Sequence, residues 1–365
     1  MSKEKILVAM SGGVDSSVTA ALLKKEGFEV IGVSMKIWDE KEEVISNSNS
    51  HSCYGPGEKE DIEDAKKVAE FLKIPFFVLD LRKEYKEIVL EYVYKEYNSG
   101  RTPNPCVLCN RVLKLNLLLE KAKELGINFS RVATGHYVRS EFDSEKKRYI
   151  LLKAKDKNKD QSYFLYSLSQ EQLKRCIFPL GNHKKEEVRT LAEKFNLPVK
   201  GKRESQDFFS EGLSLLFKNK TSPGKIVDKK GNVLGEHKGI QFYTIGQRKG
   251  LGIAIGKPLY VIRIEKEKNL IVVGEKEDLL DDKLLATNLN WVSIENPEKP
   301  IEVEAKIRYL HKEAKATVFP QENGTAFVKF EKPQSAITPG QAVVFYNGDI
   351  LLGGGTINRK NNESY

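Results

Sequence analysis

The sequence predicts an α/β protein made of a doubly wound parallel sheet, a small and mostly β central domain, and a C-terminal antiparallel β-barrel. Strand-like apolar runs alternate with helical patterns through roughly the first 200 residues, and a glycine-rich turn follows the first run. From about residue 285, strand follows strand with glycines between them. We therefore expect three domains, at residues 1–205, 206–284 and 285–365.

The first domain is expected to consist of repeated strand–helix units. Its strands are short apolar runs typical of a buried parallel sheet, at residues 5–10, 28–35, 75–81 and 131–134. Its helices carry apolar residues at helical spacing, at residues 18–26, 61–72, 82–98, 113–125 and 184–195. Ligands of such a sheet bind at the carboxyl ends of the strands. The polar segment 44–57 is expected to be a mobile loop.

The remaining two domains are expected to be mostly β. The glycine-rich stretch 221–260 contains short alternating segments, and we expect strands at 225–227 and 240–244. The barrel strands are expected at residues 301–308, 314–319, 325–330, 342–346 and 350–357.

The most informative segment is the turn at residues 11–17, Ser-Gly-Gly-Val-Asp-Ser-Ser. Its glycines allow close approach to a phosphate, and the following helix directs N–H groups and a positive dipole toward an anion. It lacks the lysine with which P-loop proteins reach the β- and γ-phosphates, so it suits attack at the α-phosphate with pyrophosphate leaving. Asp15 would hold Mg²⁺ or orient the ligand. The expected nucleotide contacts are Ala9, Met10, Ser11, Gly12, Gly13, Val14, Asp15 and Ser16. The alternative is an ordinary glycine-rich turn with helix-capping serines.

Composition and charge set the outer limits. The 365 residues are 30% charged and 40% hydrophobic, which is a soluble globular composition. The net charge of +9 favours a polyanionic partner such as nucleic acid, although a solvated lysine-rich surface explains it equally well. No apolar run approaches the ~20 residues that span a bilayer, so we expect no membrane contact and a cytoplasmic location. Four cysteines in such a chain are not a disulfide framework.

Several motifs in order make the sequence resemble the tRNA-specific 2-thiouridylases, which are pyrophosphate-loop ATPases. These motifs are residues 11–17, 35–40, 100–110, 133–137, 159–164, 178–181, 204–207, 244–248 and 307–309. The resemblance implies a sheet of the adenine-nucleotide α-hydrolase type. It also implies adenylation of the C2 oxygen of the wobble uridine (U34) in the tRNA anticodon stem-loop, with ATP and Mg²⁺. Sulfur then replaces this oxygen, and an upstream relay protein delivers the sulfur as a persulfide.

The same resemblance assigns the catalytic segment. Cys109 aligns with the nucleophile, and we expect Arg101 and Arg111 to lower its pKa. Residues Asn104, Pro105 and Cys106 would lie against the target base, in a loop that two prolines stiffen. The alternative for Cys109 is a structural thiol or half of a zinc site.

Other residues are assigned to ATP or tRNA. Met35 and Gly135 follow strands at the carboxyl edge, where adenine would lie; the alternatives are a core methionine and a tight turn. The expected tRNA contacts are His136, Lys159, Asp160, Gln161, Arg308, Tyr309 and Gln341. Without the family pattern, the charged members of this set would be read as solvated surface and His136 as structural.

The chain departs from the family at its second catalytic cysteine, because Phe209 stands at that position. We weigh three replacements: a Cys106–Cys109 redox pair that forms a disulfide, a [4Fe–4S] cluster, or lost activity. In the cluster, Cys53 would join Cys106 and Cys109 as third ligand and sulfide would be the sulfur source. We favour the cluster over the disulfide, and the intact ATP loop makes lost activity the weakest choice.

Two other functions use the same loop. Amidotransferase-like and argininosuccinate-type ligases adenylate small molecules and need neither the cysteine pair nor a terminal barrel. A lysidine-forming tRNA ligase needs no thiol. Pyrophosphate release that depends on tRNA, and activity that depends on Cys109, would separate these alternatives.

Overall fold

A computed structural model describes residues 3–39, 53–202, 216–217, 221–253 and 256–358. The position of Phe209 and most of the expected loop at 44–57 lie outside these residues. Within the described ranges, no helix is long and apolar enough to cross a bilayer.

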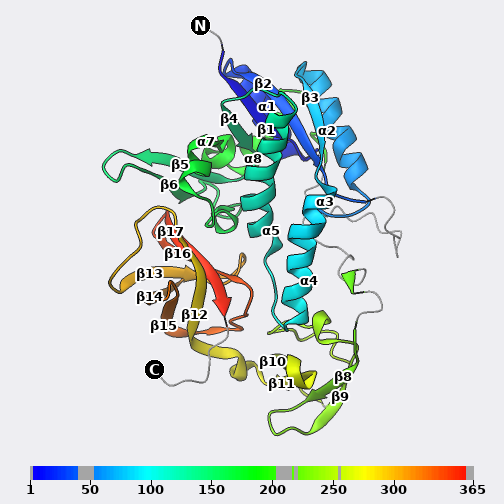
Figure 1. Cartoon of the computed structure of the whole chain (residues 1–365), viewed down its shortest axis with the longest axis vertical. Helices are drawn as coiled ribbons and strands as arrows, with labels where there is room; N and C mark the ends of the chain where they lie inside the picture. Colours follow the sequence, from blue (N-terminus) through cyan, green and yellow to red (C-terminus); the bar gives the residue numbers. More distant parts are fainter. Residues whose placement is uncertain (1–2, 40–52, 203–215, 218–220, 254–255, 359–365) are drawn as a thin grey trace.

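A five-stranded parallel sheet forms the first layer of the molecule, as predicted (Figure 1). Its spatial order is β3 (Phe76–Asp80), β2 (Glu29–Lys36), β1 (Lys5–Ala9), β4 (Arg131–Thr134) and β7 (Cys176–Ile177). The chain moves outward from β1 to β3 and then returns to β4 on the other side of β1. This reversal is the topological switch point at which such sheets bind ligands.

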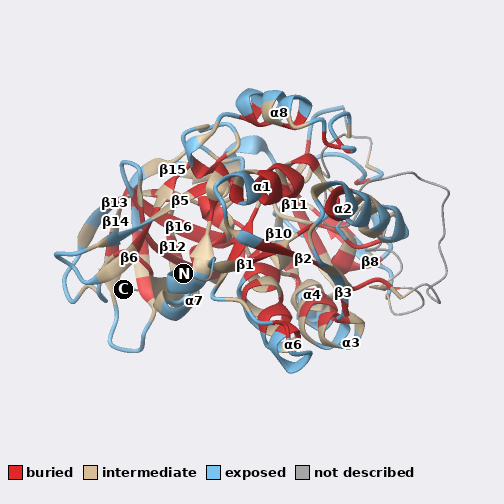
Figure 2. Ribbon diagram, turned by 90° about the horizontal axis from the view of Figure 1, so that it is seen from above, coloured by how far each residue is buried: buried red, intermediate tan, exposed pale blue. Residues whose placement is uncertain are grey.

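Helices cover both faces of this sheet, as Figure 2 shows. One face carries α1 (Val14–Lys25) and α2 (Glu58–Leu72), whose apolar side chains pack against those of β1 and β2. The other face carries the segments that surround Tyr85, Leu113 and Leu118. The helix α8 (Lys185–Lys194) packs on α1, beside the glycine-rich turn.

Two expected helices differ from the prediction in the same way. The helix expected at 82–98 is divided into α3 (Arg82–Tyr85), the π-helix η1 (Lys86–Leu90) and α4 (Glu91–Asn98). The helix expected at 113–125 begins eight residues earlier, as α5 (Pro105–Leu108), the π-helix η2 (Cys109–Leu117) and α6 (Leu118–Glu124). Pro105 occupies the first helical turn, where its missing N–H leaves no helical bond unmade. Both cysteines of the pair therefore lie on a helix, not in a loop.

The central domain contains a four-stranded sheet in the order β10 (Tyr260–Glu265), β11 (Leu270–Gly274), β8 (Gly224–Val227) and β9 (Val233–His237). The expected strand at 240–244 is wrong, because this segment contains the 3₁₀-helix η5 (Ile240–Phe242). Gly239 enters this turn at φ +150°, and Ile240 and Tyr243 both bury their side chains in the core of the domain. Alternating hydrophobicity alone did not separate such a tight turn from a strand.

The C-terminal barrel is confirmed. Six antiparallel strands close on themselves through β12–β17 pairing, in the order β12 (Leu280–Trp291), β15 (Ala326–Ser335), β14 (Ala314–Pro320), β13 (Ile301–Lys306), β16 (Ala342–Asn347) and β17 (Ile350–Asn358). The sequence prediction missed β12 and also missed the hairpin β5 (Val138–Asp143) and β6 (Arg148–Lys153). This hairpin belongs to the first domain in sequence, yet β6 pairs with β17 and extends the barrel sheet (Figure 1).

Candidate active site

The glycine-rich turn closes tightly between β1 and α1. Gly12 has φ +74°, and a Cβ atom there would lie 2.1 Å from the carbonyl oxygen of Asp61, so only glycine fits. The Ser16 hydroxyl accepts a hydrogen bond from the Ser11 N–H (3.2 Å) and donates one to the Gly13 carbonyl (3.2 Å). Gly13 caps α1 without a side-chain bond, so the first N–H groups of the helix are directed at the turn. This geometry suits an anion such as pyrophosphate.

Residues expected to contact the nucleotide come together from three strands. Met10 follows β1, Met35 is the penultimate residue of β2, and Gly135 follows β4, all at the carboxyl edge. A Cβ atom on Gly135 would lie 2.9 Å from the backbone of both Asp15 and Ser16. Gly135 is therefore needed for close packing of the β4 end on the turn. The nucleotide contacts themselves stay predictions.

The structure adds a lysine that the sequence analysis missed. Lys185, the first residue of α8, places its ammonium 2.8 Å from each carboxylate oxygen of Asp15. The hydroxyl of Tyr137 donates to the same carboxylate at 2.8 Å. The Lys185 side chain is 10% exposed and that of Asp15 28% exposed. The turn thus lacks its own lysine, but a helix 170 residues downstream supplies one. The sequence signal that could have pointed to Lys185 is its position at the start of a helix, shortly after the motif at 178–181.

The segment expected to be catalytic is a helix that carries two thiols on neighbouring positions. Cys106 and Cys109 are three residues apart, a spacing that places side chains side by side on a helix. Both thiols are free; Cys109 is buried and Cys106 is partly buried. Burial raises the pKa of Cys106 to about 12 and raises the pKa of Cys109, while the Lys114 ammonium opposes both shifts. The expectation that arginines lower the Cys109 pKa is therefore wrong.

The two arginines named for that role have other surroundings. Arg101 is bound to Glu96 at 2.8 Å and to Asn358 of the barrel at 2.6 Å. Arg111 is exposed at the surface. Lys114 is the cation that acts on the thiols, because its charge lowers the pKa of both Cys106 and Cys109.

Cys53 joins this group from a distant part of the chain. Cys53 is exposed, and its charge contributes to the raised pKa of Cys106 and of Cys109; all three thiols contribute to the raised pKa of the buried Tyr85. Tyr54, the neighbour of Cys53, is buried and stacks on Tyr85 with ring centroids 5.0 Å apart and planes 11° apart. This stacking fixes the backbone beside Cys53. In the described ranges, no group of three His, Cys, Asp or Glu side chains could hold a single metal ion.

The barrel holds the loop that precedes the cysteine helix. The side-chain amide of Gln341 donates to the carbonyls of Thr102 (3.1 Å) and Pro103 (2.9 Å), and the Thr102 N–H donates to the Pro339 carbonyl (2.8 Å). Thr102 also contacts the central domain through the Thr244 hydroxyl at 3.1 Å. All three domains therefore meet at this loop. The tRNA contact of Gln341 stays a prediction. In the structure, the amide nitrogen of Gln341 donates its hydrogen bonds to the loop.

The other residues expected at tRNA are placed around the same region. Asp160 is buried, and its carboxylate accepts hydrogen bonds from the Ala154 N–H (2.9 Å) and the Ser162 hydroxyl (2.7 Å), which indicates a structural role. Gln161 binds the backbone of Tyr137 in both directions, and Lys159 precedes it in the same turn. Burial lowers the pKa of His136 to about 3, so its ring is neutral near pH 7.

Arg308 and Tyr309 follow β13, and Tyr309 packs near Tyr163 and Phe164; their tRNA contacts stay predictions. The Tyr309 ring packs on Phe164 with centroids 4.5 Å apart, and the Arg308 guanidinium donates to the Ser335 carbonyl at 3.0 Å. Tyr163 connects Arg308 to the loop that precedes the cysteine helix, because it hydrogen-bonds to the Asn104 side chain and interacts with Arg308.

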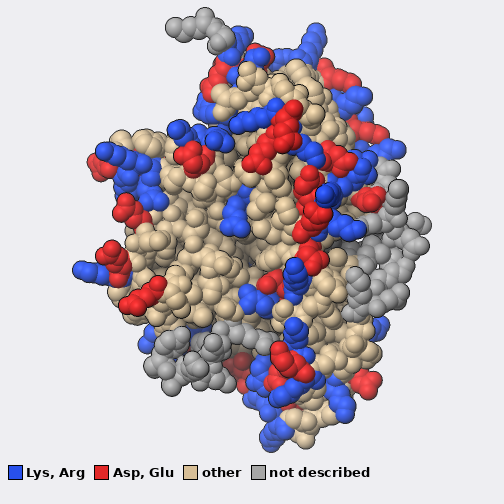
Figure 3. Space-filling view, viewed as in Figure 1, with Lys and Arg blue, Asp and Glu red and all other residues tan. Residues whose placement is uncertain are grey.

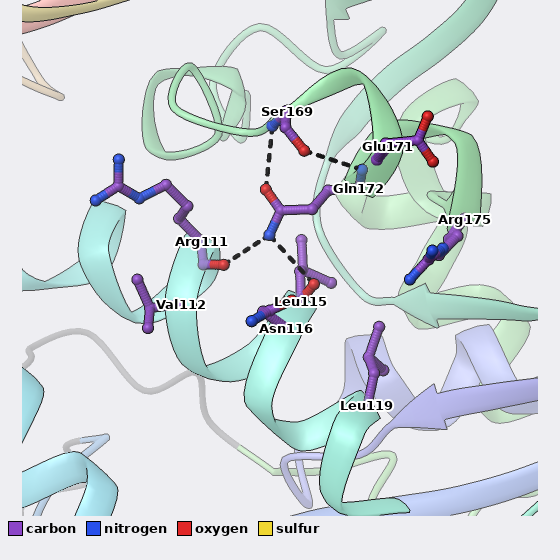
Figure 4. Close-up of a pocket in the computed structure, with 9 residues that line it drawn as sticks. All are labelled: Arg111, Val112, Leu115, Asn116, Leu119, Ser169, Glu171, Gln172 and Arg175. Atoms are coloured by element: carbon purple, nitrogen blue, oxygen red, sulfur yellow. Dashed lines mark hydrogen bonds between the residues drawn. The ribbon is translucent and has the colours of Figure 1, made fainter. Parts of the chain in front are cut away.

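A surface pocket of about 400 Å³ lies behind the cysteine helix, between η2 and α7 (Gln170–Arg175). Figure 4 shows Gln172 pointing into the helix, where its amide donates to the Arg111 carbonyl (2.6 Å) and the Leu115 carbonyl (3.2 Å). Leu115 departs from helical geometry at φ −109°. Gln172 therefore stabilises the kink in η2.

Charge is not gathered into one patch on the face that Figure 3 shows. Lys and Arg are interspersed with Asp and Glu near the top and bottom, and the centre is mostly uncharged. The net positive charge alone therefore does not locate an RNA surface on this face.

Comparisons with known proteins cover the whole described architecture. Family models named tRNA methyl transferase HUP domain, tRNA methyl transferase PRC-barrel domain and aminomethyltransferase beta-barrel domain match residues 4–209, 215–275 and 281–357. The tRNA-specific 2-thiouridylase MnmA 1 of Caldanaerobacter subterraneus is 50% identical over 363 residues, 98% of each chain. The tRNA-specific 2-thiouridylase MnmA of Caldicellulosiruptor saccharolyticus is 49% identical over 365 residues, 98% of this chain and 99% of the relative.

Solved structures show more distant likeness. A 4-thiouridine synthetase in complex with RNA and ATP aligns over 55% of this chain and 43% of its own, with 16% identity and a TM-score of 0.33. NMN synthetase from Francisella tularensis aligns over 55% of this chain and 66% of its own, with 17% identity and a TM-score of 0.32.

Proposed function

Because the chain belongs to the family of tRNA-specific 2-thiouridylases, we propose that it thiolates U34 of tRNA through a sulfur site built from Cys106, Cys109 and Cys53. The chain is an ATP-dependent tRNA sulfurtransferase, as its family is. The observation that carries the proposal is that the three thiols, from two distant segments, all affect the pKa of Tyr85 and of Lys114, and that Tyr54, next to Cys53, stacks on Tyr85.

In the first half-reaction, the C2 oxygen of the uridine attacks the α-phosphorus of ATP, and the bond to pyrophosphate breaks. The N–H groups at the start of α1 and the Ser11 and Ser16 hydroxyls would hold the leaving pyrophosphate. When ATP binds, the Lys185 side chain would move its ammonium group from Asp15 toward the phosphates. The Asp15 carboxylate would then be free to face Mg²⁺. The closeness of Lys185 to both carboxylate oxygens supports this exchange.

In the second half-reaction, sulfur forms a bond to C2 and AMP leaves. With Phe209 at the position of the usual second cysteine, the neighbouring helical positions of Cys106 and Cys109 support one route. The outer sulfur of a Cys109 persulfide would attack C2. Cys106 would then attack the Cys109 sulfur, which forms the Cys106–Cys109 disulfide and leaves the sulfur on the base.

The three thiols support a second route, through a [4Fe–4S] cluster. The donor set fits, because all three donors are sulfur and lie beside the Lys114 cation, which favours their ionised form, and because Tyr54 stacking holds the backbone at Cys53. A cluster separates its ligands further than one ion does, so three thiols that cannot hold a single ion do not argue against it. When bound, the cluster would supply an open iron that takes up sulfide. We favour this route, because it alone uses Cys53.

Anaerobic purification with iron and sulfide analysis tests the choice. For the wild type we expect about four irons per chain and a broad absorbance band near ~400 nm. Cys53→Ala should lose both signals. Cys176→Ala is the matched control, since this thiol lies on β7 and should leave the iron content unchanged. A wild-type protein without iron that still thiolates tRNA from a persulfide donor would contradict the cluster and support the disulfide.

Two further variants test the function as a whole. Cys109→Ala should abolish thiolation while tRNA-dependent pyrophosphate release continues, because adenylation precedes the sulfur step. Asp15→Ala should abolish pyrophosphate release. Pyrophosphate release that does not require tRNA would instead favour a ligase acting on small molecules.

A further inference from the structure

The turn after β13 presents an apolar side chain to solvent near the loop that precedes the cysteine helix. The His311 N–H donates to the Arg308 carbonyl at 3.1 Å, which makes Tyr309 and Leu310 the central residues of a tight turn. Tyr309 points inward onto Phe164, whereas Leu310 is 91% exposed. Among the described residues, the next most exposed large apolar side chain is Leu125 at 63%. A single exposed leucine is ordinary on a protein surface, so the meaning of Leu310 depends on its surroundings.

The turn is held firmly, so Leu310 has a fixed position. The Arg308 guanidinium donates to the Ser335 carbonyl on β15 at 3.0 Å. On the other side of the turn, Glu313 forms an ion pair with Lys153 of β6 at 2.5 Å. An apolar group held on a rigid turn loses little conformational entropy when it inserts into a partner.

The tip carries positive charge around the leucine. The Lys306 ammonium lies 5.7 Å from the centroid of the Tyr309 ring, Arg308 begins the turn, and Lys312 follows it in the sequence. The nearby carboxylate of Glu313 is already paired with a lysine. An apolar tip among cations fits a nucleic acid better than an apolar protein groove, because the cations meet phosphates while the apolar group meets base faces.

The position of the turn indicates which part of the RNA it would meet. Tyr163 hydrogen-bonds to Asn104 of the loop expected at the target base and interacts with Arg308, and the Tyr309 ring of the turn lies 6.2 Å from the Tyr163 ring. Only one residue separates Arg308 from Leu310. The tip therefore lies close to the loop that is expected to hold the target base.

We propose that Leu310 enters the base stack of the anticodon loop and occupies the space that the target uridine leaves when it turns into the active site. Extruding a base costs stacking energy, and apolar side chains inserted between bases offset this cost in other nucleic-acid complexes. Leu310 would thus stabilise the extruded state without contacting the reacting atoms. This inference rests on the proposed action on U34.

A fluorescent RNA hairpin tests the proposal. The hairpin carries uridine at the wobble position and 2-aminopurine on its 3′ side, whose fluorescence rises when the neighbouring base leaves the stack. Wild-type protein should raise the fluorescence. Leu310→Ala should lower the extruded fraction and the rate of RNA-dependent pyrophosphate release about tenfold, with RNA affinity within about threefold of wild type.

Two control variants make the result specific. Leu310→Met keeps an apolar side chain of similar size and should restore the fluorescence rise. Leu125→Ala removes the same chemistry from the end of α6 and should behave as wild type.

Three outcomes would overturn the inference or its premise. An unchanged fluorescence rise in Leu310→Ala would refute it. A Leu310→Lys variant as active as wild type would also refute it, because the tip would then contact phosphate and not bases. If the wild type released no RNA-dependent pyrophosphate, the proposed function itself would fail.

Discussion

Replacing Lys185 by methionine would test the assignment of the downstream lysine to the ATP site. The change keeps the volume of the side chain and removes its charge. In the structure, Lys185 is 2.8 Å from both oxygens of Asp15. We expect Lys185→Met to lower the rate of tRNA-dependent pyrophosphate release about 100-fold, since losing one preorganised group that stabilises developing charge costs about 3 kcal/mol.

The expected loss of pyrophosphate release can be separated from a loss of stability. At 2.8 Å the gross attraction between the two charges is about 6 kcal/mol for an effective dielectric constant near 20. Desolvation opposes most of this attraction, and Tyr137 still donates to Asp15 in the variant. We therefore expect Lys185→Met to lower the free energy of unfolding by about 1–3 kcal/mol.

A double variant completes the test. Asp15→Asn combined with Lys185→Met leaves no unpaired charge, so its unfolding free energy should lie closer to wild type than that of Lys185→Met. The rate of pyrophosphate release by the double variant should be as low as that of the less active of the two single variants, Asp15→Asn and Lys185→Met. The measurements are chemical denaturation and a coupled pyrophosphate assay with saturating tRNA. A Lys185→Met enzyme that releases pyrophosphate within threefold of wild type would refute the reasoning.

Three further predictions follow from single contacts. Gln341→Leu removes two hydrogen bonds to the loop before the cysteine helix and should destabilise the fold by about 2 kcal/mol in denaturant titrations; an unchanged midpoint would contradict the role of the barrel in holding that loop. Gly12→Ala should abolish ATP binding in calorimetry, because its Cβ would collide with a backbone carbonyl, whereas Gly27→Ala, with open space around its Cβ, should bind normally. The pKa of His136 falls from 6.5 to about 3 on folding, so its contribution to stability is complete above pH 6.5 and is lost as the pH falls toward 3; His136→Asn should therefore unfold with a weaker pH dependence than wild type between pH 7 and 4.

The parallel sheet and the barrel were predictable from sequence because their signals are local. Strand 131–134 matches β4 in both bounds, and the glycine turn at 11–17 lies between a strand and a helix as expected. Short apolar runs and turn glycines report on burial and backbone geometry at their own positions.

The features that the sequence analysis missed depend on contacts between distant segments. Lys185 could not be matched to Asp15, because a lysine at a helix start usually faces solvent. The raised pKa of Cys109 arises from burial by several helices, and the nearby arginines in sequence are turned elsewhere. By contrast, Cys53 was chosen from its place at the functional edge, and in the structure its charge contributes to the pKa of the other two thiols; its role as a cluster ligand stays a prediction.

The pairing of β6 with β17 has a consequence for how the chain matures. The β5–β6 hairpin is synthesised early, and Gln170 soon binds the backbone of Tyr149, but the rest of the outer edge of β6 is completed only when Ser293 and then Ile350 and Leu351 arrive. During translation this edge stays open while about 200 further residues emerge, and an open strand edge invites pairing with other chains. Nonsense mutations anywhere in the barrel should therefore yield aggregating products, not a separable N-terminal enzyme.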